Sequence, residues 1–154
     1  MTYEQATAVL VQRQLLSRDD RRSLLSELAE LGGDLLSAVA QRSGDAARVQ
    51  RALAEAVLQD APRVRLFSAV HDPAALGYLS AREAWDHLVL PLQVEPDGTV
   101  VCCTTRETLP TTLAFLYERL DAPFRIVLAD LGPLELYIAE QYGYEGVEID
   151  NEAA

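Results

Sequence analysis

A chain of 154 residues with 49% hydrophobic and 24% charged residues has the size and composition of one modest globular domain or two small lobes. Its formal net charge of −11 disfavours nucleic acid and anionic membranes as direct partners, because binding to either depends on clustered cations. All thirteen basic residues are arginine, and the lack of lysine excludes a phosphate loop of the Gly-x-x-x-x-Gly-Lys type.

The N-terminal part of the chain carries helical signals throughout. Ser17 precedes a run with two acidic residues in its first turn, which is typical of a capped helix start. Gly32 and Gly33 are expected to end that helix, and Asp34 to cap the next one. A further break falls at Asp45 or the glycine before it. We therefore predict a helical lobe over 1–62, with helices at 2–16, 18–31, 35–42 and 46–59.

The hydrophobic period changes after this lobe. Two apolar runs joined by Pro96-Asp97-Gly98 have the form of a β-hairpin, because these residues favour a tight turn. Ser80 is placed to cap one helix and Gly143 to close the last. The expected elements are a strand at 64–70, a helix at 81–88, the hairpin at 89–105, a helix at 108–120, a strand at 124–130 and a helix at 132–143. This order predicts an α+β fold, in which the helical lobe precedes a small α/β sandwich of three to four strands with helices packed on the sheet.

Residues that could carry out chemistry are few. Cys102 and Cys103 are neighbours in an apolar strand and point to opposite faces, so we expect buried structural thiols. His71 lies in a turn and His87 at a helix end, without the spacing of a metal-binding pair. Trp85, the only tryptophan, is expected in the core. We therefore predict no enzyme activity, no catalytic residue, no metal and no cofactor.

Five stretches between Ala81 and Gly146 follow one another in a recognisable order: "EAWDHLVLPLQV", "EPDGTVVCC", "TLAFLYERL", "FRIVLAD" and "LELYIAEQYGYE". This set resembles the N-terminal domain family of type II secretion and type IV pilus assembly ATPases, the GspE/PilB/MshE N-terminal domain. The segment "TTRETLP" departs from the Ala-x-x-Asp-Pro turn of that family. The resemblance implies a domain by which such ATPases attach to an inner-membrane partner, and similar domains are fused to membrane glycosyltransferases.

One branch of this family carries two tandem motifs that bind cyclic di-GMP, and each motif starts with arginine, leucine and glycine. When the motifs are aligned with this chain, the polar signature is lost in both copies. The first copy has Gln5, Ala6 and Thr7 at the three starting positions, retains Leu10 and Leu25, and has Arg21 and Leu28 in place of a leucine and the final glutamine.

The second copy begins at Asp34, which stands where the motif has arginine, and Leu36 stands where it has glycine. An aspartate at this position repels the phosphates of the ligand, and a leucine side chain blocks the close approach of the backbone. The apolar character of the copy survives at Val39, Val49 and Leu53, with Ala56 in place of glutamine.

Two functions follow from these observations. The first is a non-catalytic docking domain of a bacterial secretion, pilus or envelope-polysaccharide system, with Trp85, Tyr142 and Tyr144 as candidate partner-binding residues. The second is a cyclic-di-GMP-binding regulatory domain with an atypical site. Its candidate ligand-binding residues are Arg13, Arg18, Arg21 and Arg22 as substitute cations, together with Leu10 and Asp34.

The expected partner is a protein: the cytoplasmic part of an inner-membrane assembly protein, or an attached ATPase or glycosyltransferase. No nucleic acid and no direct membrane insertion are expected. The N-terminus lacks signal-peptide features and no apolar run approaches the length of a membrane span, so we predict a cytoplasmic protein that its partner recruits to the inner membrane. The expected division is a helical lobe at 1–62, an α+β domain at 63–146 and an acidic tail at 147–154.

Overall fold

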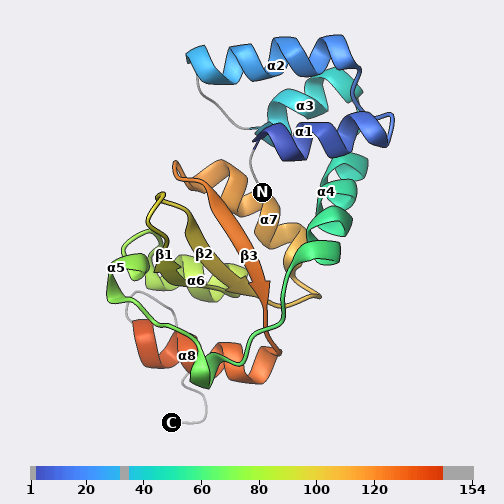
Figure 1. Ribbon diagram of the computed structural model, residues 1–154. Helices are drawn as coiled ribbons and strands as arrows, with labels where there is room; N and C mark the ends of the chain where they lie inside the picture. Colours follow the sequence, from blue (N-terminus) through green and yellow to red (C-terminus); the bar gives the residue numbers. More distant parts are fainter. Residues whose placement is uncertain (1–2, 32–34, 144–154) are drawn as a thin grey trace.

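The computed structural model describes residues 3–31 and 35–143, and its fold is α+β (Figure 1). Four helices come first, and a mixed sheet with further helices follows. The elements are α1 (Tyr3–Gln12), α2 (Arg18–Leu31), α3 (Leu35–Ser43), α4 (Ala46–Asp60), the 3-10 helix η1 (Leu66–Ser68), α5 (Pro73–Leu76), α6 (Ala81–His87), β1 (Val89–Val94), β2 (Val100–Thr104), α7 (Leu109–Arg119), β3 (Phe124–Leu128) and α8 (Leu131–Tyr142).

The predicted helix caps at Ser17 and Ser80 are confirmed, and at the predicted break before α4 Asp45 is the N-cap. The backbone N–H of Asp20 donates to Ser17 Oγ (3.0 Å), and that of Arg48 donates to Asp45 Oδ1 (3.1 Å). At α6, Ser80 and the glutamate three residues later form a reciprocal capping box. The predictions for Gly32, Gly33 and Asp34 lie outside the described residues.

The sheet has the order β1-β2-β3, with β1 and β2 antiparallel and β2 and β3 parallel. The predicted hairpin turn is confirmed: Gly98 has a φ of +90°, and Thr99 N–H donates to Asp97 Oδ1 (2.9 Å). The strand predicted at 64–70 is wrong. Only an isolated bridge joins Arg63 to Leu128, and the chain then turns into η1.

Helices cover both faces of the sheet (Figure 1), so alternate strand residues enter two different buried clusters. One cluster joins the first face of the sheet to α7 and to helices α1–α4. The other joins the second face to η1, α6 and α8. Cys102 lies in the first cluster and Cys103 in the second, and both are free and fully buried, as predicted.

We expect both thiols to resist a thiol reagent such as Ellman's reagent in the folded protein at pH 8. Burial raises the pKa of Cys102 and of Cys103 from 9.0 to about 12, which lowers the thiolate fraction about 1,000-fold. The unfolded chain loses these protons at a lower pH, so the free energy of unfolding should fall as pH rises from about 9 towards 12. Two thiols should react at once in denaturant. Rapid reaction of the native protein would contradict this burial.

The segment that departs from the family pattern builds a network of threonines at the start of α7. Thr104 Oγ1 donates to the carbonyl of Leu88 (2.8 Å), and Thr112 Oγ1 donates to the carbonyl of His87 (2.7 Å). Thr108 joins the network through a 3.0 Å contact with Thr104 Oγ1. Leu88 is in the left-handed conformation (φ 48°) between α6 and β1. The network therefore satisfies two carbonyls that neither a helix nor the sheet can pair there.

Candidate functional site

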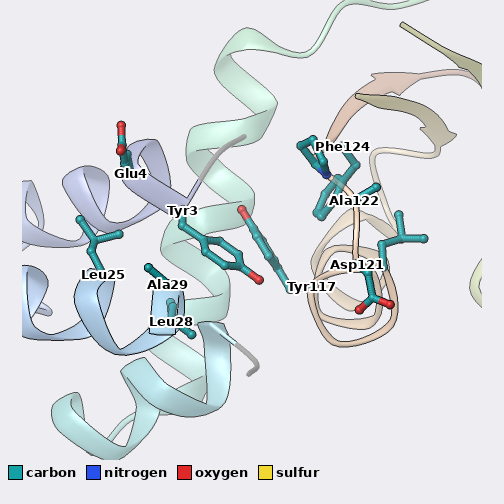
Figure 2. A pocket seen from close by; sticks show the side chains of 11 residues that line it. Tyr3, Glu4, Leu25, Leu28, Ala29, Tyr117, Asp121, Ala122 and Phe124 are labelled. Carbon is teal, nitrogen blue, oxygen red and sulfur yellow. The ribbon is translucent and has the colours of Figure 1, made fainter. Parts of the chain in front are cut away.

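A cavity of about 580 Å³ lies between the α1–α2 pair and the connection from α7 to β3. We call it the Tyr117 cavity (Figure 2). Its walls are mostly apolar, and Tyr117 and Phe124 contact each other edge to face on the sheet side with ring centroids 5.0 Å apart. Its lining residues are Tyr3, Glu4, Leu25, Leu28, Ala29, Tyr117, Leu120, Asp121, Ala122, Pro123 and Phe124.

Among the described residues that line this cavity, Tyr117 alone has a buried side-chain polar atom without a hydrogen-bond partner. The residue is 3% exposed, and its hydroxyl has no hydrogen-bond partner among the described residues. Burial, followed by the neighbouring hydroxyl of Tyr3, raises the pKa of Tyr117 well above its usual range. The two tyrosine rings lie side by side, with centroids 6.3 Å apart (Figure 2). The Tyr117 hydroxyl therefore stays protonated and has a hydrogen bond to donate.

We expect Tyr117→Phe to raise the free energy of unfolding by about 1 kcal/mol, because it removes a buried hydroxyl that makes no hydrogen bond. Thermal or urea unfolding measures the change. Tyr78→Phe, at a half-buried tyrosine outside the cavity, is the matched control. A loss of stability in Tyr117→Phe would show that the hydroxyl has a partner in solution.

The four arginines proposed as substitute cations do not line the Tyr117 cavity. Arg21 joins α2 to α1, since its guanidinium donates to Thr7 Oγ1 (3.0 Å) and to the carbonyl of Glu4 (3.1 Å). Arg18 and Arg22 are exposed. Leu10 is fully buried in the core. Asp34, proposed with them, lies outside the described residues.

Arg13 lies in a different place, at the junction of α1 with α4. It forms an ion pair with Glu55. Together with Arg48 and Arg51, which the sequence analysis did not single out, these residues surround a hollow of about 160 Å³. A hollow of this size is smaller than the about 300 Å³ at which small-molecule pockets begin, so it fits a single phosphate better than a cyclic dinucleotide.

The aligned motif positions are largely core positions. In the second copy, Leu35, Val39, Val49 and Leu53 are fully buried. The side chain of Leu36 lies outside the described part. In the first copy, however, two positions line the Tyr117 cavity: Leu25, and Leu28 in place of glutamine. The apolar pattern of the motifs therefore holds the helical lobe together, and at these two positions it also forms one wall of the cavity.

Two of the three aromatic residues proposed for partner binding are half-buried in the fold. The indole N–H of Trp85 donates to the carbonyl of Gly143 (3.0 Å), and the hydroxyl of Tyr142 donates to the carbonyl of Leu76 (2.8 Å). Both side chains pack against the second buried cluster, beside α8. Tyr144 lies outside the described residues. Trp85 and Tyr142 thus connect α5 and α6 to the end of α8.

The two histidines also take part in packing. His71 Nε2 donates to the carbonyl of Leu66 (2.6 Å), and its ring stacks on Tyr137 with centroids 4.9 Å apart. His87 stacks on Phe115 at 3.7 Å. No group of three or more His, Cys, Asp or Glu within residues 3–31 and 35–143 could hold a metal ion.

A second surface carries large exposed apolar side chains from η1 and α8. We call it the η1–α8 face and define it by Phe67 (73% exposed) and Leu136 (64%), which line one groove; Val70 (60%) follows η1 in the chain, and Leu131 (46%) is the first residue of α8. These are four of the five large hydrophobic residues that are exposed in the described part of the chain. The segment that contains η1 runs alongside α8 (Figure 1), and a groove of about 570 Å³ opens between Phe67 and Leu136. Exposed apolar patches of this kind mark contact surfaces.

Sequence reasoning missed this face because Phe67 and Val70 were assigned to a strand. No local signal separates Phe67 from a buried residue, because neighbours in a strand covered on both faces can both be buried, as Cys102 and Cys103 are. In the structure Leu66 is 2% exposed, and Phe67 points outward.

No protein-family model matches this chain, and no curated protein matches it. Several solved structures are similar to it, and they include the following two. One is MshE with cdg, which is 19% identical with a TM-score of 0.49, and the alignment covers 92% of this chain and 99% of that one. The other is the N-terminal domain of XpsE, which is 19% identical with a TM-score of 0.42, covering 92% of this chain and 96% of that one. Of the helices described, none is both long and apolar enough to cross a bilayer.

Proposed function

We propose that this chain is a non-catalytic docking domain of a bacterial secretion, pilus or envelope-polysaccharide system. The η1–α8 face carries the proposal, because two large and strongly exposed apolar side chains, Phe67 and Leu136, line one groove. Burial of Phe67 and Leu136 by a partner would remove apolar surface from water at the centre of the contact. In this proposal the organisation is a helical lobe at 1–62, an α+β domain at 63–146 and an acidic tail at 147–154.

The charges beside the groove favour one kind of partner. Arg63 and Arg65 lie at its edge on a chain whose net charge is strongly negative. Arg63 pairs with Asp130 (2.5 Å), whereas Arg65 is exposed and forms no ion pair with any described residue. An amphipathic helix with apolar anchors and a flanking carboxylate complements this surface. We propose that this helix belongs to the cytoplasmic part of an inner-membrane assembly protein. That protein would recruit this otherwise cytoplasmic chain to the inner membrane.

Site-specific photo-crosslinking in cells tests the proposal. A photoreactive phenylalanine analogue at Phe67 should give an adduct with the cytoplasmic part of an inner-membrane protein, identified by mass spectrometry. The same analogue at Ala47, an exposed residue of α4, serves as the control. An absence of adducts at position 67, equal adducts at both positions, or crosslinks only to a second copy of this chain would contradict it.

A cyclic-di-GMP-binding function is the second candidate, and one observation favours it: Arg13, Arg48 and Arg51 surround one hollow. The two phosphates of the nucleotide need cations and donors, yet Arg13 is already paired with Glu55. We expect isothermal titration calorimetry with cyclic di-GMP to give no saturable heat. Saturable micromolar binding that Arg13→Ala, Arg48→Ala or Arg51→Ala removes would support the second candidate against the first.

A further inference from the structure

We propose that the Tyr117 cavity binds an uncharged aromatic small molecule whose acceptor group receives a hydrogen bond from the Tyr117 hydroxyl. This ligand site is separate from the η1–α8 face, so it goes beyond the docking function. It uses none of the arginines considered for a cyclic dinucleotide.

The size and walls of the cavity suit such a molecule. Small-molecule pockets range from about 300 to 1,000 Å³ and are mostly apolar, and this cavity of about 580 Å³ falls within that range. Leu25, Leu28 and Ala29 of α2 lie on one side, and Phe124 and Ala122 lie on the other (Figure 2). Three of the ten aromatic residues of the chain line it. Their rings favour a planar ligand, which they contact by stacking or edge-to-face packing.

The Tyr117 hydroxyl determines which polar group the ligand carries. Tyr117 lines the cavity from α7, and its hydroxyl is buried and has no partner among the described residues. An unpaired buried donor is costly, and an acceptor that satisfies it contributes more than the same bond would in water. Tyr3, which is 36% exposed, lies next to this hydroxyl (Figure 2), so a small rotation of its ring gives the ligand access.

The charges around the cavity exclude anions. Of the residues that the structure describes, the charged ones lining the cavity are Glu4 and Asp121, and none is an arginine. Both carboxylates lie at the periphery, away from the pair of tyrosine rings (Figure 2). Their negative potential opposes a carboxylate or a phosphate in the cavity, whereas it leaves a neutral molecule unaffected.

Two fluorescent probes of similar size test the site. Prodan is a neutral naphthalene with a ketone acceptor, and 1-anilinonaphthalene-8-sulfonate is an anionic one. We expect saturable one-to-one binding of prodan to the intact chain with a blue shift in emission, and no saturable binding of the anionic probe.

Three variants locate the binding. Tyr117→Phe keeps the ring and should weaken prodan binding about fivefold, because one hydrogen bond is lost. Ala29→Trp should abolish saturable binding by filling the cavity from an exposed position of α2, and Ala47→Trp on α4 should leave binding unchanged. Circular dichroism confirms that each variant is folded.

A further double variant tests the role of charge. Removing both carboxylates with Glu4→Gln and Asp121→Asn should allow the anionic probe to bind.

The proposal is overturned if prodan shows no saturable binding, or if Ala29→Trp binds prodan as well as Ala47→Trp does. Tighter binding of the anionic probe or of cyclic di-GMP to the unmodified chain, removed by Ala29→Trp, would assign the cavity to anions instead. Loss of prodan binding in Ala29→Trp with an intact crosslink at Phe67 would separate this site from the docking face.

Discussion

The double variant Phe67→Asp/Leu136→Glu is expected to weaken binding of the protein partner roughly 100-fold or more while the domain stays folded. Each substitution places a carboxylate where the partner should bury an apolar anchor, and central anchors contribute about 2 kcal/mol or more each. The fold tolerates the changes because Phe67 is 73% and Leu136 64% exposed, so neither contributes much to the buried core. Affinity for the crosslinked partner segment, measured by calorimetry or fluorescence anisotropy, gives the result.

The matched control for this prediction is Ser26→Asp/Ala47→Glu. It adds the same two negative charges at exposed positions of α2 and α4, away from η1 and α8. Partner affinity should change less than about threefold in the control, since exposed charges at a distance are screened. Equal loss of binding in both double variants would indicate a general charge effect and contradict the η1–α8 face as the contact surface.

Thr112→Val is expected to lower the free energy of unfolding by about 2 kcal/mol. Valine has nearly the shape of threonine, so packing is kept, but the carbonyl of His87 loses the hydroxyl that donates to it at 2.7 Å. Thr112 is fully buried and lies 3.3 Å from Thr104 Oγ1, so the change also weakens the contact between the two threonines. Urea unfolding monitored by circular dichroism measures the difference.

Thr111→Val provides the control in the same helix. Thr111 is exposed, and its hydroxyl donates only to the nearby carbonyl of Thr108 (3.0 Å), so we expect a change within about 0.5 kcal/mol. If both variants lose the same stability, the cost would come from placing valine in α7, and the threonine network would not be the cause.

Most of the secondary structure could be predicted because its signals are local. Ser17 and Ser80 cap helices through their own side chains, and Gly98 adopts the positive φ of the hairpin turn. The strand at 64–70 could not be excluded from the sequence. Its apolar residues suit a strand, but only Arg63 pairs with β3 before the chain turns away, and that outcome depends on how α8 packs over Leu66.

The candidate sites were less predictable than the fold. Trp85 and Tyr142 hydrogen-bond to residues distant in the chain, and nothing local shows that their polar atoms donate to the carbonyls of Gly143 and Leu76. Phe67 has the most exposed large apolar side chain of the described residues, yet it fell within the strand predicted at 64–70, so its exposure was not expected. The local sequence does not distinguish Tyr117 from any other position of an amphipathic helix. The cavity beside it forms only because α1 and α2 lie close to the connection from α7 to β3.

By itself, the sequence determined most of the helices, the hairpin and strand β3, and the sides on which the hairpin residues are buried. Cys102 and Cys103 illustrate this: strand geometry alone sends neighbours to opposite faces, and the two buried clusters contain one each. The segment "TTRETLP" was a departure in sequence, and in the tertiary structure its Thr104 and Thr108 form a hydrogen-bond network with Thr112 of α7. Exposure and cavities depend on contacts between elements far apart in the chain. For this reason only the packing of the helices on the sheet determines the exposure of the η1–α8 face and the burial of the unpaired Tyr117 hydroxyl.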